Sequence, residues 1–246
     1  FAVLELLSHI DIKPDILHLH DWQTAMIATL YKERYAYYEY YQGIKIVFTI
    51  HNIAYQGKCD PALLSDHFGL DNYLYYNGNC RNDGCFNMMK AAIYYSDIIT
   101  TVSPTYAKEI LTDSFGEGLQ NILQMRRHDL YGILNGIDYE TINPATDPEI
   151  VEHFDITNVD AKKVINKLAL QKECGLPENK DVPLIGIVTR LTWQKGLDLI
   201  INRMEELMKR DVQVVILGAG DQKYEEPLKG IAAYHNQKLS LNLKYD

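Results

Sequence analysis

The sequence predicts an α/β protein with two parallel β-sheets, and three observations lead to this prediction. Short, almost uninterrupted apolar segments alternate with segments whose apolar residues recur at helical spacing. Polar residues directly follow most of these apolar segments. A more polar stretch at 143–182 with several prolines separates two such runs, so we expect two domains. Buried parallel strands have this continuous apolar pattern, and helices are expected on both faces of each sheet.

The first run contains four predicted strands, at residues 16–20, 45–50, 98–102 and 131–134. A helix is expected over about residues 24–40, and the apolar residues Phe1, Leu4 and Leu7 also have helical spacing. A further helix begins at Ser103-Pro104, because serine is a favoured N-cap and proline fits the first helical position. The Asn135-Gly136 pair is predicted to close the fourth strand with a turn.

The second run begins with a predicted helix over about 160–174, which Gly175 ends. Strands are predicted at 183–188, 212–217 and 239–245, with an amphipathic helix between Leu197 and Met208. Gly218-Ala219-Gly220 follows the second of these strands and indicates a tight turn close to other backbone. It is not the dinucleotide-binding fingerprint, and no helix is predicted after it at the spacing of that fingerprint.

Composition excludes several classes of protein. The 246-residue chain carries a formal net charge of -9 and no block of Lys or Arg, so no nucleic-acid partner is expected. No run of about 18 apolar residues occurs, so no membrane partner is expected. The four cysteines form no CxxC pair and no cluster has metal-ligand spacing; we expect free thiols, no metal and no cofactor. Because Phe1 lies inside an apolar helix-like stretch, and the end of the chain inside a predicted strand, we expect a piece of a longer protein.

Candidate functional residues lie directly after the predicted strands, where ligands bind in open parallel sheets. His51-Asn52 follows the second strand, and both side chains donate and accept hydrogen bonds, as sugar hydroxyls require. The alternative is a structural histidine beside a turn asparagine. Asp21 follows the first strand, either as a carboxylate that faces a sugar hydroxyl with Trp22 as an apolar wall or as the cap of the next helix.

The segment from Arg190 to Lys195 is the most distinctive feature of the sequence. It carries two cations between a strand and the beginning of a helix, where the helix dipole disfavours positive charge. A bound phosphate or pyrophosphate offsets this cost, because backbone amides, a guanidinium and an ammonium then meet on one anion. The alternative is a pair of solvated cations.

Six motifs occur in this order: HDW at 20–22, FTIHNIAYQG at 48–57, KAAIYYSDIITTVSPTYAKEI at 90–110, LNGID at 134–138, VTRLTWQKGLDLI at 188–200 and LGAGD at 217–221. Together they closely resemble the bacterial glycogen synthase and starch synthase family, retaining glucosyltransferases that use ADP-glucose. The resemblance implies a two-domain GT-B-type glycosyltransferase with two Rossmann-like domains, both incomplete in this chain. Residues 1–142 would belong to the N-terminal, acceptor-side domain and 143–246 to the nucleotide-sugar-binding domain.

The resemblance also implies roles for individual residues. It assigns His51, Asp21, Arg190 and Lys195 to catalysis, with Arg190 and Lys195 as ligands of the pyrophosphate and His51 in contact with the transferred glucose. Donor binding would further involve a set of polar side chains: Asn52, Asn135, Gln194 and Tyr245, the last near the adenine. The implied partners are ADP-glucose and an α-1,4-glucan such as a glycogen or starch primer. No metal is implied, and the location would be cytoplasmic, or the plastid in a plant.

The chain also departs from the family pattern. The glycine-rich lysine loop, the downstream catalytic-site glutamate and the second glycine-rich loop are absent, so the chain alone is expected to be inactive. Trp193 stands where the family often has a small residue. Two alternatives stay open: a related GT-B enzyme that uses a UDP-sugar, and a non-catalytic module that binds a nucleotide sugar or glucan. The absence of GxGxxG and of an acidic ribose partner argues against an NAD-dependent dehydrogenase.

Overall fold

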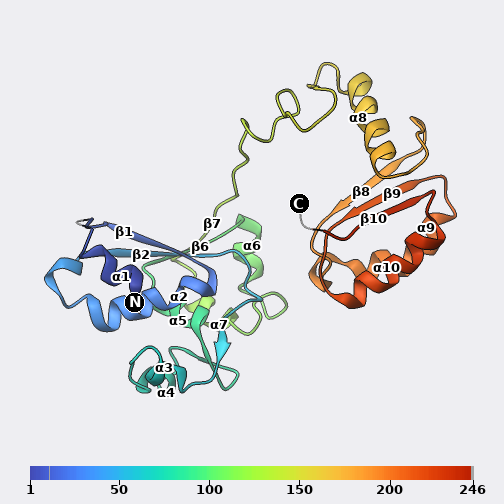
Figure 1. Ribbon diagram of the computed structural model, residues 1–246. Coiled ribbons are helices and arrows are strands. Elements are labelled where there is room, and N and C mark those ends of the chain that lie inside the picture. Colours follow the sequence, from blue (N-terminus) through green and yellow to red (C-terminus); the bar gives the residue numbers. More distant parts are fainter. Residues whose placement is uncertain (11, 245–246) are drawn as a thin grey trace. The chain divides into compact units, whose positions relative to one another are not determined.

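The computed structural model describes residues 1–10 and 12–244 (Figure 1). The chain divides into two compact units, Phe1–Gly136 and Ile137–Asp246, and each is described by itself. The sequence places the domain boundary after residue 142, within the stretch from 133 to 158 that contains turns but no helix or strand.

Unit 1 is built on a parallel sheet of four strands in the order β1-β2-β6-β7. The strands are β1 (Ile16–His20), β2 (Lys45–Ile50), β6 (Ile98–Thr101) and β7 (Leu130–Gly132). The four predicted strands are therefore confirmed, but β7 ends two residues early and the predicted Asn135-Gly136 turn is wrong. The Ile133 amide still donates to Thr101 O at 2.8 Å, and residues 133–138 then form neither strand nor turn.

The helices of unit 1 are α1 (Ala2–Leu7), α2 (Asp21–Leu30), α5 (Met88–Tyr95), α6 (Pro104–Glu109) and α7 (Gln120–Met125). The Ser103 hydroxyl caps α6 by accepting from the Tyr106 amide at 2.9 Å, as predicted. The helix predicted to reach residue 40 is shorter, because α2 continues only as a π-helical turn at Tyr31–Tyr35. The buried Tyr31 hydroxyl donates to Tyr41 O and Ile44 O, which turns the chain back toward β2.

A small antiparallel sheet lies between β2 and α5 in the chain. Its order is β3-β5-β4, with β3 at Lys58–Cys59, β5 at Cys85–Asn87 and β4 at Arg81–Asn82. Two short helices, α3 (Leu63–Asp66) and α4 (Tyr73–Tyr76), belong to the same insertion. The sequence did not predict these elements, because two- and three-residue strands have no measurable periodicity.

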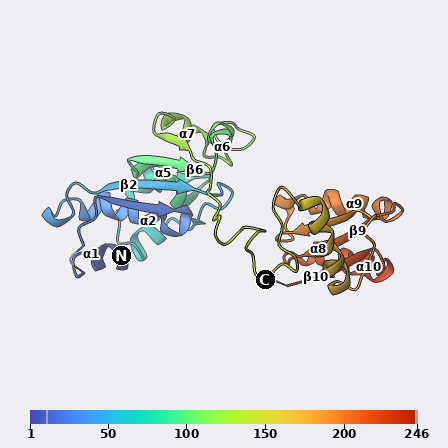
Figure 2. The same ribbon diagram turned by 90° about the horizontal axis from the view of Figure 1, so that it is seen from above.

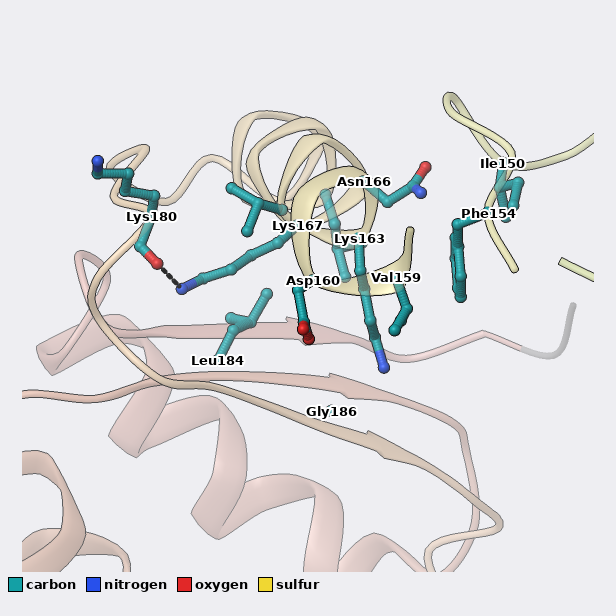
Figure 3. Close-up of a pocket in the computed structure, with 12 residues that line it drawn as sticks. Ile150, Phe154, Val159, Asp160, Lys163, Asn166, Lys167, Lys180, Leu184 and Gly186 are labelled. Carbon is teal, nitrogen blue, oxygen red and sulfur yellow. Dashed lines mark hydrogen bonds between the residues drawn. The ribbon is translucent and has the colours of Figure 1, made fainter. Parts of the chain in front are cut away.

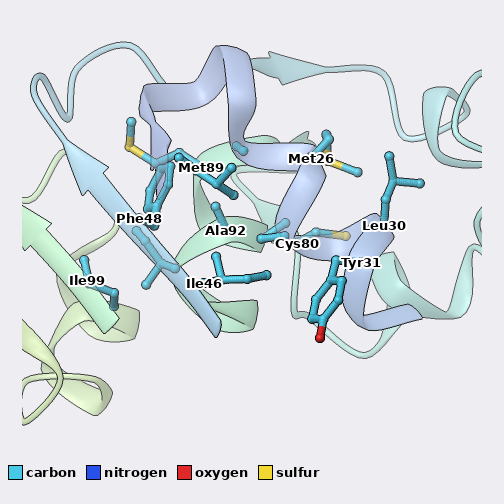
Figure 4. Packing of buried hydrophobic residues seen from close by; sticks show 14 of the residues in the cluster. Met26, Leu30, Tyr31, Ile46, Phe48, Cys80, Met89, Ala92 and Ile99 are labelled. Carbon is cyan, nitrogen blue, oxygen red and sulfur yellow. The ribbon is translucent and has the colours of Figure 1, made fainter. Parts of the chain in front are cut away.

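The core of unit 1 lies between its sheet and the packed pair α2 and α5 (Figure 4). Phe48 and Ile46 from β2 and Met89 from α5 are fully buried there. On β1 only Leu17 and Leu19 are buried, while the face with Ile16, His18 and His20 is exposed. Helices were expected to cover both faces of the sheet. Among the described residues this expectation is wrong at β1, where one face is exposed.

Unit 2 contains a second parallel sheet in the order β10-β9-β8 (Figure 1). Figure 2 shows β9 and β10 from above. Its strands are β8 (Leu184–Val188), β9 (Gln213–Leu217) and β10 (Leu239–Asn242), and its helices are α8 (Val159–Glu173), α9 (Leu197–Met208) and α10 (Gln222–Tyr234). Helix α10 corrects the prediction that no helix follows Gly220 at the spacing of the dinucleotide-binding fingerprint. Pro227 and the charged residues around it hide the helical pattern, although buried Tyr224 and Leu228 provide an apolar face.

Two further findings concern the whole described chain. No helix among residues 1–10 and 12–244 is long and apolar enough to cross a membrane. The thiols of Cys59, Cys80, Cys85 and Cys174 are free, as expected, and burial raises the pKa of the Cys80 thiol to about 12.

We expect Phe48→Ala to lower the free energy of unfolding of unit 1 by about 3–5 kcal/mol, because it leaves a cavity under β2. Val47→Ala is the matched control: Val47 is half-buried and points to the opposite face, so its loss costs about 1 kcal/mol. Urea unfolding followed by Trp22 fluorescence in a Trp193→Phe background measures both. Equal losses of unfolding free energy in the two variants would contradict the conclusion that the core lies on the side of the sheet that Phe48 faces.

Candidate active site

Asp21 joins the ends of β1 and β2. Its carboxylate Oδ1 accepts from the His51 amide at 2.8 Å and from the Asn52 amide at 3.4 Å. It therefore does not cap α2, whose first turn instead has Thr24 Oγ1 bonded to both the amide and the carbonyl of His20. Asp21 has φ of +53°, a left-handed conformation that is strained for a non-glycine residue, and its bonds to the β2 loop hold it there.

His51 and Asn52 lie at the end of β2, next to Asp21, so the structure brings these three predicted site residues together. The His51 side chain is exposed, and its Nε2 lies 3.0 Å from His20 Nδ1. Within the described residues its Nδ1 has no hydrogen-bond partner. Asn52 Oδ1 accepts from the Ala54 amide at 3.1 Å, which shapes the following turn.

Behind His51, polar side chains form a row across the sheet, from the exposed His18 and His20 on β1 to the buried Thr49 and Thr100 on β2 and β6. The rings of His18 and His20 lie 4.2 Å apart between centroids. His18 Nε2 is 2.7 Å from Thr49 Oγ1, which is 2.6 Å from Thr100 Oγ1. Desolvation, followed by the nearby charges of His20 and His51, lowers the pKa of His18. Sequence reasoning missed His18 and the two threonines. The alternation of histidine with apolar residues in ILHLH at 16–20 was the available signal for His18.

Two buried amides hold the loop that follows His51. Gln56 Nε2 donates to Ile53 O at 3.0 Å and to Glu117 O at 2.9 Å. Asn87 Nδ2 donates to Gln56 Oε1 at 2.7 Å, so this loop is fixed to the beginning of α5. These contacts also went unpredicted, because a single glutamine in a loop carries no pattern.

Trp22 packs against the same loop. A Cβ at Gly57 would come within 2.7 Å of the Trp22 ring, so the glycine lets the indole approach the backbone. Trp22, Tyr55 and Met88 line a cavity of about 570 Å³.

The segment from Arg190 to Lys195 follows β8 and precedes α9, as predicted. The side chains of Arg190 and Lys195 are exposed. Among residues 1–10 and 12–244, neither side chain makes a hydrogen bond or an ion pair. A 3₁₀ turn at Trp193–Lys195 and the left-handed Gly196 lead into Leu197, the first residue of α9. Two uncompensated cations therefore stand before the positive end of this helix, an arrangement that an anion would stabilise.

Gly218 and Gly220 hold the loop that carries Arg190. The Leu191 amide donates to Ala219 O at 3.0 Å, and the Asp221 amide donates back to Leu191 O at 2.9 Å. A Cβ at Gly218 would overlap the carbonyl oxygen of Thr189, and one at Gly220 would overlap that of Leu191. The predicted close approach to other backbone is thus confirmed, and the partner is the segment on either side of Arg190.

Three predicted site residues remain: Asn135, Gln194 and Tyr245. Asn135 is exposed and lies three residues beyond β7, with no side-chain hydrogen bond to any described residue. Gln194 is half-buried in the 3₁₀ turn beside Lys195. Tyr245 lies outside the described residues.

A separate cavity of about 520 Å³ lies between α8 and β8 in unit 2 (Figure 3). Its lining is mainly apolar, with Asp160 and Lys163 from α8 among the few charged groups. Lys167 is already engaged, because its Nζ donates to the carbonyls of Lys180 and Val182. None of the predicted site residues lines this cavity. Across the described part of the chain, no group of three or more His, Cys, Asp or Glu side chains is arranged to hold a metal ion.

The parallel sheets with polar groups at the strand ends define a Rossmann-like α/β protein. A family model described as the starch synthase catalytic domain matches residues 1–125, and the chain belongs to this family. The glycogen synthases of Streptococcus agalactiae serotype Ia and Clostridium perfringens are each 49% identical to it over 245 residues, which is 100% of this chain and 51% of theirs. The chain thus spans about half the length of the curated relatives it matches.

Solved structures agree with the family assignment. The catalytic domain of Arabidopsis thaliana starch synthase IV, bound to ADP and acarbose, matches 100% of this chain and 51% of its own with a TM-score of 0.90 and 39% identity. Anabaena HepE, in complex with UDP and glucose, matches with a TM-score of 0.52 at 11% identity and shares the fold alone. The predicted fold class, GT-B-type with parallel Rossmann-like sheets, is confirmed.

We expect Gly220→Ala to destabilise unit 2 and to loosen the Arg190 loop, because the new methyl group displaces Leu191 O. Hydrogen exchange at the Leu191 and Asp221 amides should become faster. Gly230→Ala is the matched control: Gly230 lies inside α10 with open space around it, so alanine should stabilise by about 0.5–1 kcal/mol. Unchanged exchange in Gly220→Ala would show that the loop does not need this close approach.

The lowered pKa of His18 predicts a pH-dependent stability of unit 1. The unfolded chain binds a proton at His18 more readily than the folded chain does, so this stability is complete above about pH 6.5 and is lost as the pH falls toward the folded pKa. His18→Gln should therefore flatten the decrease in the urea midpoint between pH 7 and pH 5. His67→Gln, at an exposed histidine of the same unit, should leave the decrease as in the wild type. Parallel curves for all three proteins would refute this account.

Proposed function

We propose that the chain carries part of the active site of a glycogen or starch synthase. The whole enzyme would transfer glucose from ADP-glucose to the non-reducing end of an α-1,4-glucan, with retention of the anomeric configuration. Membership of the starch synthase catalytic domain family supports this proposal. The observation that carries it is the pair of unpartnered cations, Arg190 and Lys195, in front of α9.

The donor's pyrophosphate would bind at these cations. Departing ADP accumulates negative charge on its β-phosphate, and a guanidinium can contact two phosphate oxygens at once. Lys195 supplies a second charge, and the first amides of α9 would add hydrogen-bond donors. The backbone of the loop that carries Arg190 is held against the loop after β9. The cations would stabilise the leaving group most strongly once water is excluded.

The transferred sugar would contact the end of β2. His51 offers a ring nitrogen without a protein partner in the described residues, and Asn52 adds a carboxamide. Asp21 holds the backbone of both residues, so its part in catalysis would be to orient them and to support the positive charge that develops at the anomeric carbon. The roles of Asn135, Gln194 and Tyr245 as donor contacts rest on the motif match.

Unit 1 would belong to the acceptor-side domain and unit 2 to the nucleotide-sugar-binding domain. The glycine-rich lysine loop and the downstream glutamate of the family are not in this sequence. We therefore propose that the 246 residues alone bind the nucleotide but do not transfer glucose. A cytoplasmic location, or the plastid in a plant, belongs to the same proposal.

Nucleotide binding to the chain should depend on the two cations. Arg190→Ala and Lys195→Ala should each weaken ADP binding in isothermal titration calorimetry by about tenfold or more, because a charge-assisted contact is lost. Lys209→Ala is the matched control, since Lys209 follows the opposite end of α9 and is exposed. ADP affinity that is the same in all four proteins would contradict the proposal, and tighter binding of UDP than of ADP would favour a UDP-sugar donor.

Transfer itself can be measured in a chimera in which these 246 residues replace the matching segment of the Streptococcus agalactiae glycogen synthase. The chimera should incorporate labelled glucose from ADP-glucose into glycogen, and Arg190→Ala should lower the rate on the order of 10²-fold. UDP-glucose and the Lys209→Ala chimera are the controls. A chimera that folds, binds ADP and transfers nothing would argue for a binding module.

A further inference from the structure

His20 makes a contact that the proposed mechanism does not yet use. It is the last residue of β1, and its Nδ1 lies 3.0 Å from Nε2 of His51, with ring centroids 5.3 Å apart. Because His51 Nε2 is occupied in this way, Nδ1 is the ring nitrogen that remains for a substrate. The contact with His20 therefore decides which ring nitrogen of His51 stays available.

The backbone of His20 and its ring each have a neighbour that restricts them. Thr24 fixes its backbone through the hydrogen bonds to the His20 amide and carbonyl, at 2.7 and 2.8 Å. Its other neighbour is the His18 ring, 4.2 Å away and tilted by 35°, and His18 is anchored to Thr49. A side chain that is packed and bonded in this manner has one orientation to offer His51.

We propose that His20 is a positioning residue: its Nδ1 accepts the proton of His51 Nε2 and so fixes His51 in the tautomer whose Nδ1 presents a lone pair to a sugar hydroxyl. In a neutral imidazole one nitrogen donates and the other accepts, and the bond at one nitrogen decides the role of the other. The part that concerns the sugar rests on the proposed function.

The direction of this hydrogen bond follows from the two rings together. With His51 as the donor, both histidines carry their proton on Nε2, the intrinsically favoured position in neutral histidine. The reverse direction places both protons on Nδ1 and leaves two rings in the less favoured form. The assigned tautomer makes His51 an acceptor at Nδ1, which suits a hydroxyl and not a phosphate oxygen.

The test is the tautomeric state of His51 in the 246-residue chain, read from long-range ¹H–¹⁵N correlation spectra at pH 7.5, above the ordinary histidine pKa of about 6.5. In the wild type, His51 should show a protonated Nε2 and an unprotonated Nδ1. His20→Phe keeps the ring and its stacking on His18 but removes the acceptor, and should give averaged nitrogen shifts. His20→Asn, whose amide oxygen can stand near the place of Nδ1, should restore the single tautomer.

His67→Phe, at an exposed histidine of unit 1, is the matched control and should leave the His51 signals unchanged. Amide spectra of each variant report whether it is folded, and His20→Asn keeps the test informative if His20→Phe does not fold. A protonated Nδ1 in the wild type would overturn the assigned tautomer. His51 shifts that are the same with and without an acceptor at position 20 would overturn the positioning role.

In the chimera, His20→Phe should lower kcat with ADP-glucose about tenfold and leave the KM for glycogen unchanged, and His20→Asn should recover most of the rate. A loss that His20→Asn does not recover would count against the role in transfer. The spectra do not depend on activity, so a folded chimera that transfers no glucose would count against the proposed function and leave the tautomer result to be judged separately.

Discussion

Both parts of the candidate site depend on bonds between the loops that follow neighbouring parallel strands. In unit 1 the Asp21 carboxylate takes the amides of His51 and Asn52, and so ties the end of β1 to the end of β2. In unit 2 the Leu191 and Asp221 amides cross between the loops after β8 and β9. Parallel strands deliver these loops to one edge of each sheet, and the cross-links convert nearness into fixed geometry.

Each of these cross-links requires a backbone arrangement that is unfavourable for most residues. Asp21 adopts a left-handed backbone conformation, and the second loop requires glycine at positions 218 and 220. Strain of this kind persists only where surrounding contacts hold it. Arg190 and Lys195, unpaired among the described residues, are a comparable cost in electrostatic form, because their charges oppose the dipole of α9. The backbone of both loops is thus held by contacts within the chain, and two positive charges lie beside the second loop.

Much of this arrangement could be predicted from the sequence. The continuous apolar runs predicted the strands of the two parallel sheets, although β7 ends earlier than predicted. The positions of His51 and Arg190 just after strands, at the ends of β2 and β8, were predicted as well. Helix α10 was missed because Pro227 interrupts its pattern, and the small sheet of β3 to β5 was too short to have one. The Asp21 contact was interpreted as a sugar contact or a helix cap, since periodicity carries no information on which distant amide a carboxylate meets. The same limit concealed the His20–His51 pair, which depends on the register of β1 against β2.

The central claim is that Arg190 and Lys195 form a site for the terminal phosphate of a nucleoside diphosphate. The most direct measurement is the ³¹P spectrum of ADP during titration with the chain and with its Arg190→Ala variant. The account predicts that the β-phosphorus resonance shifts with the wild type, more than the α-phosphorus resonance does, and that Arg190→Ala removes most of this shift. A β-phosphorus resonance that moves equally with both proteins, or with neither, would contradict it.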